Sequence, residues 1–127
     1  MGEYLTIEEM AEVFKVQVTT VRRWRRWGLP FYRVGKRLYF KREEALRWIR
    51  AHNHEGQYNP EDVGEIPPGG GELLTLKEVA KELHLTPRTL KRWAEVKGFP
   101  YHRVGKTMYV FRDELDAWVK EQQQDKK

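Results

Sequence analysis

One stretch of the sequence, found once in each half of the chain, decides the fold. Residues 18–30 read VTTVRRWRRWGLP, and residues 87–100 read PRTLKRWAEVKGFP. Apolar side chains recur in both stretches at the spacing of one helix face. A glycine then ends each pattern, because glycine tolerates the left-handed conformation that closes many helices. We therefore predict helices over residues 18–27 and 87–97.

The similarity extends outward from these stretches over most of the chain. Residues 33–36 and 103–106 both read RVGK. The offset between the halves is 69 residues up to Trp24 and Trp93, and 70 after one extra residue near Lys97. About seventeen of some 46 aligned positions are identical. Each half is therefore one copy of the same small unit.

A second helix is predicted before each stretch. Thr6 and Glu9, like Thr75 and Glu78, have the spacing of a capping box, in which side chains at the start of a helix satisfy its first backbone donors. Apolar residues follow at helical spacing. The first helix therefore begins at Thr6 in one copy and at Thr75 in the other. With the short turn that follows and the helix already predicted, it forms a helix-turn-helix.

A β-hairpin and a third helix are predicted after each stretch. Residues 32–34 and 38–40 are rich in β-formers and flank Gly35-Lys36, a pair that suits a two-residue type II′ turn. The second copy repeats this pattern over residues 102–110, and the third helices begin near Arg42 and Arg112. The fold class is therefore mainly α with small β-hairpin wings, as two tandem winged helix-turn-helix domains.

Tryptophan is the expected core residue, because units this small bury little surface and large aromatic side chains bury the most area per residue. We expect Trp24 and Trp48 in the first core and Trp93 and Trp118 in the second, with a contribution from Trp27.

The chain divides into residues 1–52 and 73–127, each a domain, and a connector over residues 53–72. The net charge of +5 is uneven: residues 1–55 carry +5, residues 56–72 carry −4 and residues 73–127 carry +4. Prolines and three consecutive glycines make the connector read as a linker, partly stiff and partly loose. The alternative is that it packs between the units. Basic blocks favour a polyanionic partner, most often nucleic acid.

Basic side chains cover the outward face of each helix in the two defining stretches. Arginines so close together repel one another, and they make sense if phosphates lie opposite; Arg also pairs with guanine in the major groove. The alternative is a solvated basic face. The candidate DNA-binding residues on these helices are Thr19, Thr20, Arg22, Arg23, Arg26, Arg88, Thr89, Lys91 and Arg92.

The hairpin tips supply a second basic group, whose expected role is contact with the sugar-phosphate backbone, which gives affinity but little sequence information. The alternative is charge that only solubilises the hairpin. The candidate wing residues are Arg33, Lys36, Arg37, Arg103 and Lys106.

The sequence gives little evidence for disulfides, metal sites, catalysis or a membrane span. Cysteine is absent, so disulfides and thiolate metal sites are excluded, and the four histidines show no ligand spacing. No catalytic set stands out, so we expect no enzyme, cofactor or metal. No apolar run approaches the roughly 20 residues that span a bilayer, and we expect a cytoplasmic protein.

Taken together, these motifs resemble the excisionase-type winged helix-turn-helix family, which is related to the DNA-binding domain of the MerR regulators. The motifs are Leu-Thr-x-x-Glu-x-Ala, Arg-Trp before Gly-x-Pro, the Arg-Val-Gly-Lys wing and a Trp in the final helix, and they cover most of residues 4–51 and 73–122. The resemblance implies a recognition helix in the major groove and a wing against the backbone or minor groove. By position, it implies groove contacts from Arg22, Arg23, Arg26, Lys91 and Arg92, and wing contacts from Arg33, Lys36, Arg103 and Lys106.

This chain departs from the pattern of most relatives in carrying two units. It also lacks the dimerising helix and effector domain of MerR regulators, so we expect no metal- or drug-sensing role. We expect double-stranded DNA as the partner, with two units on half-sites about 34 Å apart. The leading hypothesis is an excisionase-like recombination directionality or architectural factor, working with an integrase or recombinase. We expect a nucleoid-associated protein of bacterial or phage origin.

Two alternatives remain open at this point. The first is a MerR-like transcriptional regulator that works with the transcription machinery, and the second is a DNA-packaging or protein-interaction adaptor. We expect a monomer with an internal repeat that can assemble cooperatively on DNA.

Overall fold

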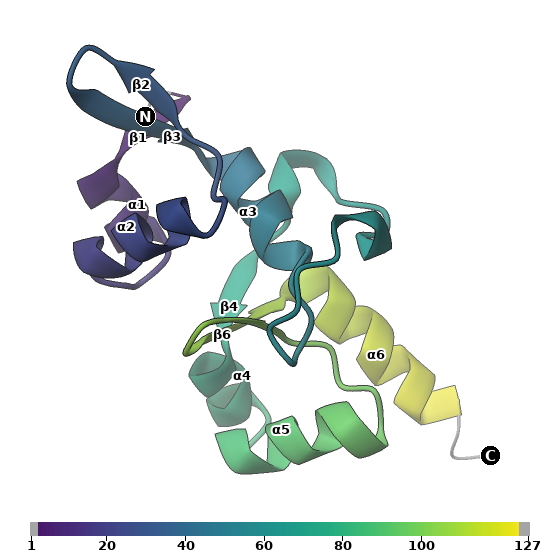
Figure 1. Cartoon of the computed structure of the whole chain (residues 1–127). Coiled ribbons are helices and arrows are strands. Elements are labelled where there is room, and N and C mark those ends of the chain that lie inside the picture. The colour runs from purple at the N-terminus through teal and green to yellow at the C-terminus, as the bar shows by residue number, and fades with distance from the viewer. Residues whose placement is uncertain (1–2, 125–127) are drawn as a thin grey trace.

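The computed structural model describes residues 3–124, and it shows the same six elements twice (Figure 1). We call the first set unit 1 and the second unit 2. Unit 1 consists of β1 (Tyr4–Thr6), α1 (Ile7–Val13), α2 (Val18–Arg26), β2 (Tyr32–Val34), β3 (Arg37–Lys41) and α3 (Arg42–Arg50). Unit 2 consists of β4 (Leu73–Thr75), α4 (Leu76–Glu82), α5 (Pro87–Val96), β5 (His102–Val104), β6 (Thr107–Phe111) and α6 (Arg112–Gln124). The predicted fold class, mainly α with hairpin wings in two tandem copies, is confirmed.

Both predicted capping boxes are present. The backbone N–H of Glu9 donates to Thr6 Oγ1 over 3.1 Å, and the N–H of Thr6 donates to Glu9 Oε1 over 2.8 Å. Thr75 and Glu78 make the same pair of bonds at the same distances. These bonds satisfy backbone donors that the first turn of a helix leaves free.

The turn between the two helices uses a left-handed residue that is not glycine. Lys15 has a φ of 57°, and His84, its counterpart in unit 2, has a φ of 58°. In both turns the next N–H bonds back to the first helix, from Val16 to the carbonyl of Ala11 and from Leu85 to that of Ala80. A left-handed conformation costs an L-residue roughly 1–2 kcal/mol, so each turn holds a little strain.

The hairpins follow the prediction, but each gains a third strand. Both sheets have the order N-terminal strand, second hairpin strand, first hairpin strand, which is β1-β3-β2 in unit 1. Gly35 has a φ of 64° and Lys36 a negative φ, so the turn is type II′. The N-terminal strands β1 and β4 were not predicted, because three residues are too few to show alternation.

The two faces of each sheet have different environments. Side chains alternate along a strand, so Leu5 and Phe40 point together into unit 1 while Tyr32 and Tyr39, which are paired, share the opposite face. We call that opposite face, in either unit, the outer sheet face. In unit 1 it also carries Val34, which is 66% exposed.

The outer sheet face of unit 2 is buried against unit 1. Val104, Tyr109 and Phe111 are at most 1% exposed and belong to the same hydrophobic cluster as the core of unit 1. The Tyr109 ring lies 6.4 Å from the ring of Phe14 and 6.2 Å from that of Trp24. Its hydroxyl donates to the carbonyl of Phe14, and burial raises the pKa of this phenol. One sheet therefore separates two cores.

Ion pairs join the units beside this apolar contact. The Arg50 side chain, from α3, is 3% exposed and pairs with Asp113 at the start of α6 over 2.6 Å. Its guanidinium lies 3.9 Å from the centre of the Phe111 ring and also donates to the carbonyl of Gly70. Lys15 pairs with Glu78 over 2.6 Å. We call the whole contact between the units the junction.

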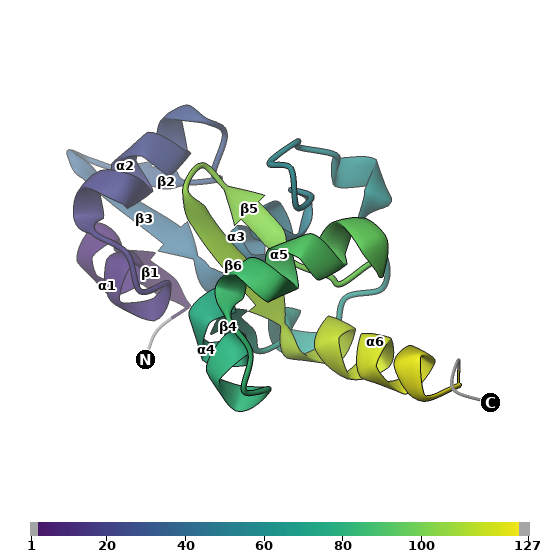
Figure 2. The same cartoon turned by 90° about the horizontal axis from the view of Figure 1, so that it is seen from below.

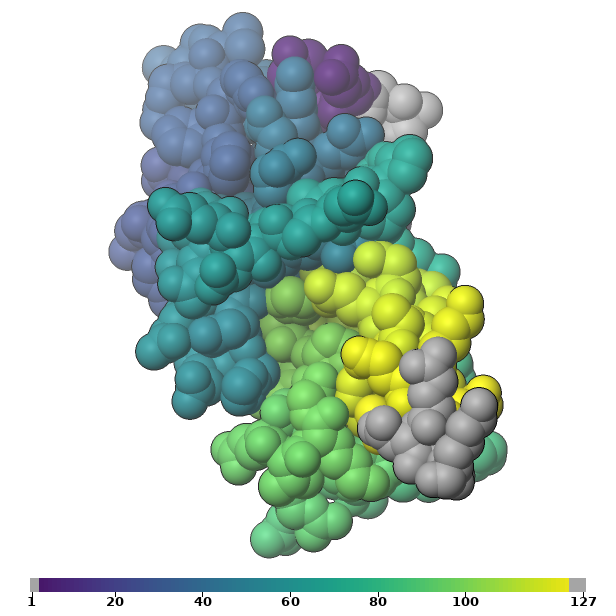
Figure 3. Space-filling view, turned by 90° about the vertical axis from the view of Figure 1, so that its right-hand side faces the viewer, coloured from purple at the N-terminus to yellow at the C-terminus, as the bar shows by residue number. Residues whose placement is uncertain are grey.

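The connector packs against both units, which is the alternative to a linker that is partly stiff and partly loose. Asn59 donates to the carbonyl of Ala51 over 2.6 Å, and the carbonyl of Asn53 accepts from the backbone N–H of Arg103. Gly70 lies so close to α3 that an added Cβ would stand 2.6 Å from Leu46 Cδ1. Two short 3-10 turns, η1 (Pro60–Asp62) and η2 (Pro68–Gly70), shape the segment, which lies as a teal band on the surface in Figure 3.

The tryptophan prediction holds with one exception. Trp24, Trp48 and Trp118 are buried, and Trp93 packs half-buried against the second cluster. Trp27 is 50% exposed and is not a core residue. It covers the hairpin tip of unit 2 instead, where a Cβ added at Gly105 would lie 2.9 Å from its ring.

Candidate nucleic-acid interface

In each unit the helix-turn-helix lies on one side of the sheet (Figures 1 and 2), and the second helix, α2 or α5, carries exposed side chains on its outer side. The inner face of α2 is anchored by Val21 and Trp24, which are at most 1% exposed. Arg22, Arg23 and Arg26 consequently point outward and are exposed. Within residues 3–124, none of these three guanidinium groups pairs with a carboxylate.

The N-terminal part of α2 places two hydroxyls beside these arginines. Thr19 is exposed and Thr20 is half-buried, and both belong to the first turn of α2. In helix-turn-helix proteins, the N-terminal residues of the recognition helix are the ones that contact base edges. Arg25 differs from its neighbours. It is half-buried, and its guanidinium lies 5.4 Å from the centre of the Phe31 ring. Its side chain therefore lies toward Phe31 and not on the outward face of α2.

The equivalent helix of unit 2 is less basic. Arg88, Lys91 and Arg92 are exposed, and among the described residues none of them pairs with a carboxylate. Thr89 is half-buried, and its hydroxyl bonds to that of Thr86, the N-cap residue. Glu95 stands where α2 has Arg26, so α5 carries three basic side chains and one acid where α2 carries four basic side chains. The two helices therefore present different surfaces to a ligand.

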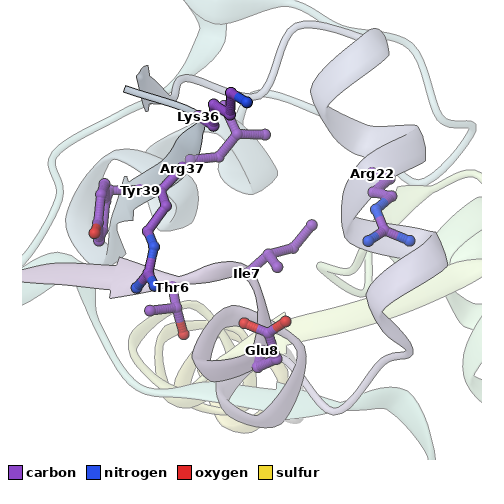
Figure 4. A pocket seen from close by; sticks show the side chains of 8 residues that line it. Thr6, Ile7, Glu8, Arg22, Lys36, Arg37 and Tyr39 are labelled. Atoms are coloured by element: carbon purple, nitrogen blue, oxygen red, sulfur yellow. The ribbon is translucent and has the colours of Figure 1, made fainter. Parts of the chain in front are cut away.

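The wing of unit 1 completes a basic hollow next to α2. Arg33, Lys36 and Arg37 are all exposed. A concave surface of about 460 Å³ lies between Arg22 on one side and Lys36 and Arg37 on the other (Figure 4). Its lining is Thr6, Ile7, Glu8, Arg22, Lys36, Arg37, Leu38 and Tyr39. Three cations and one carboxylate make the hollow suited to a phosphate backbone.

The wing of unit 2 lies in the junction and is not free like that of unit 1 (Figure 2). The Arg103 guanidinium donates to the carbonyls of Gly105 over 3.0 Å, His54 over 3.4 Å, and Glu55. The structure therefore places Arg103 in the junction and not on a free wing, because backbone carbonyls of the connector occupy its donors. Lys106, at the tip, remains exposed.

The residues of the junction are the ones that sequence reasoning missed. A signal for them exists: residues 108–111 read MYVF, an unbroken apolar run, where unit 1 has LYFK. A strand that is apolar on both faces indicates a sheet covered on both sides. Arg50 gave no comparable signal, since a single arginine near the end of a helix is usually solvated.

Metal-ligand groups, a buried histidine and the character of the helices bear on other kinds of function. Within residues 3–124, no group of three or more His, Cys, Asp or Glu residues is arranged to hold a metal ion. His52 is buried in the junction, where its Nδ1 lies 2.8 Å from the carbonyl of Trp48, and burial lowers its pKa. No described helix has the length and apolar character that crossing a membrane requires.

A helix-turn-helix followed by a hairpin wing, with a basic second helix open to solvent, defines the class of winged helix-turn-helix DNA-binding proteins, here with two units in one chain. The family model described as "Helix-turn-helix domain" matches residues 4–53 and 73–123. The chain belongs to this family, of the excisionase type, and the predicted resemblance is confirmed. It is a DNA-binding family and not an enzyme family. No curated protein and no solved structure matches the chain significantly.

Proposed function

We propose that this protein is an excisionase-like architectural factor, which directs recombination by binding double-stranded DNA at two adjacent half-sites. The observation that carries the proposal is the set of exposed arginines on α2 that pair with no carboxylate among residues 3–124 and stand beside the basic hollow of the wing. Unpaired cations gathered on one face are stabilised by a polyanion more than by water alone.

Unit 1 is the principal DNA-binding unit in this proposal. Arg22, Arg23 and Arg26 contact the major groove, where Arg pairs with guanine O6 and N7. Lys36 and Arg37 contact the sugar-phosphate backbone beside it. In unit 2, α5 contacts the second half-site with its own set of residues, Arg88, Thr89, Lys91 and Arg92. Because α2 and α5 differ in sequence and charge, the two half-sites differ as well.

The junction supports an architectural role. Two units on a loose tether would adapt to the DNA, whereas units joined by the buried Arg50–Asp113 pair and a shared sheet keep one relative orientation. A duplex that engages both helices must follow the shape of the protein. Bending a 20–30 base-pair site by 40–90° costs about 1–6 kcal/mol, which contacts at two half-sites can offset. The partner expected at such a site is an integrase or recombinase.

Selection of bound duplexes from a random pool tests the proposal first. The expected result is a bipartite site with unlike halves about one helical turn apart. Fluorescence energy transfer between the ends of that duplex is then expected to increase on binding, as the DNA bends. Selection of a single short site together with an unbent duplex would contradict the architectural role. Absence of any binding at low salt would contradict DNA binding itself.

A further inference from the structure

The internal repeat gives each surface of the junction a counterpart elsewhere in the chain. The junction joins the outer sheet face of unit 2 to a surface of unit 1 that we call the acceptor surface, formed by Phe14, Trp24 and Trp48. The outer sheet face of unit 1 and the acceptor surface of unit 2 are therefore the equivalent pair, and both are open.

The open sheet face of unit 1 carries two of the three apolar residues that make the junction in unit 2. Tyr39 corresponds to Tyr109, and Val34 corresponds to Val104, which is 1% exposed where Val34 is 66% exposed. Gly35 has no atom within 4 Å of an added Cβ, where its counterpart Gly105 touches Trp27. A hollow of about 450 Å³ marks this face, lined by Tyr4, Tyr32, Arg33, Val34 and Tyr39.

The open acceptor surface of unit 2 repeats the aromatic residues that receive Tyr109 in unit 1. Leu83, Trp93 and Trp118 correspond to Phe14, Trp24 and Trp48. Trp93 is only half-buried, because no ring covers it as the Tyr109 ring covers Trp24. A hollow of about 520 Å³ lies here, lined by Leu83, Leu85, Trp93, Lys97, Trp118, Val119 and Gln122. The Lys97 ammonium lies 4.6 Å from the centre of the Trp93 ring at one side of it.

One charge pair of the junction also has a counterpart of opposite sign on the two open surfaces. The buried pair of Arg50 and Asp113 has Lys120 and Glu43 as its counterpart, both exposed and again of opposite sign. Lys41 takes the place of Phe111, so the contact between the Arg50 guanidinium and an aromatic ring has no equivalent. A contact between the open surfaces is therefore of the same kind as the junction, but weaker.

We propose that a second copy of this chain is the partner for both surfaces: the outer sheet face of unit 1 docks on the acceptor surface of unit 2 of the neighbouring chain. The Tyr39 ring then occupies the hollow beside Trp93, and Glu43 pairs with Lys120. The contact is heterologous, so each chain keeps one free surface of each kind. Assembly proceeds head to tail and does not stop at a symmetric dimer.

The test uses one variant for each surface, measured by sedimentation equilibrium of the full chain without DNA. Val34→Glu blocks the sheet face, and Val96→Glu blocks the acceptor surface at the position equivalent to Trp27; Val96 is 68% exposed, so both changes spare the core. Concentrations up to about 1 mM populate complexes with dissociation constants of that order. The unaltered chain is expected to exceed the mass of two chains, and each variant to remain at 15.3 kDa.

An equal mixture of the two variants is the decisive sample. One intact surface of each kind remains, so the mixture is expected to form a dimer of two chains and no larger species. Glu43→Lys and Lys120→Glu are each expected to weaken assembly, and the double variant to restore it, whereas Glu61→Lys in the connector is a matched control that leaves assembly unchanged. A monomeric unaltered chain at about 1 mM, or a mixture that stays monomeric, would overturn the proposal. Since no DNA is present, neither result depends on the proposed function.

Discussion

Replacing Arg33 and Arg103 by alanine, one at a time, is expected to give opposite results, although the two residues occupy the same position in the repeat. Arg33 is exposed on the free wing of unit 1. Arg103 is half-buried, and its guanidinium donates to carbonyls of the connector and the hairpin turn. The first change removes a cation that the family resemblance assigns to the wing contact with DNA, and the second removes a link within the junction.

The magnitudes follow from these contacts. A cation that neutralises one phosphate contributes about 0.9 to the slope of log affinity against log salt concentration, so Arg33→Ala is expected to flatten the slope by that amount. Its DNA affinity is expected to fall by about 1–2 kcal/mol, with the free energy of unfolding unchanged. Arg103→Ala removes hydrogen bonds to the carbonyls of Gly105, His54 and Glu55, and is expected to lower the free energy of unfolding by about 1–2 kcal/mol with the salt slope unchanged.

Two measurements on each variant separate these outcomes: a salt titration of DNA binding by fluorescence anisotropy, and urea unfolding followed by tryptophan fluorescence. An Arg103→Ala variant that flattens the salt slope as much as Arg33→Ala does would contradict the different roles assigned to the two arginines. In that case the Arg103 guanidinium leaves the carbonyls of the connector and joins the DNA interface.

Four further predictions concern the helices, the junction and pH. Arg23→Ala and Arg92→Ala are each expected to weaken DNA binding by about 1–3 kcal/mol in a gel-shift assay, and unchanged affinity of a folded double variant would remove α2 and α5 from the interface. Arg50→Ala is expected to lower the free energy of unfolding in urea by about 2–3 kcal/mol, because it leaves the partner carboxylate and the carbonyl of η2 without their donor; a loss below 0.5 kcal/mol, the range of surface changes, would contradict this. His84→Gly is expected to raise the melting temperature by relieving a left-handed residue, with a gain of about 0.5–1 kcal/mol, and a lower melting temperature would show that the turn holds no strain. Burial lowers the pKa of His52, so the unfolded chain binds a proton at this imidazole more readily than the folded chain does. The free energy of unfolding is therefore expected to decrease as the pH falls below about 6.5. In the His52→Gln variant, the part of this decrease that is due to His52 is expected to disappear.

The local structure could be predicted from the sequence wherever one residue type has one local role. Thr6 and Thr75 begin their helices as predicted, and Pro87 occupies the start of α5 after its N-cap. The type II′ turn at Gly35 follows from the two-residue loop itself. These features depend on contacts between residues within about four positions of one another along the chain, so the local sequence is enough to predict them.

The arrangement of the two units could not be predicted in the same way. The composition of the connector indicates flexibility, but its backbone carbonyls are bound by Arg103 and its Gly70 packs on α3. The same composition would suit a flexible tether, because glycine permits close packing of the backbone as readily as it permits conformational freedom. Trp27 also shows this limit, since its helical spacing matches the core while its ring covers Gly105 of the other unit.

The sheet between the two cores also affects how the chain reaches its folded state. The hydroxyl of Tyr109 bonds to the carbonyl of Phe14, a residue 95 positions earlier. Contacts so distant along the chain close slowly, and exposed apolar surface persists until they form. On the ribosome, the first unit therefore remains incompletely covered until most of the protein has been made, and the two units are expected to unfold in a single transition.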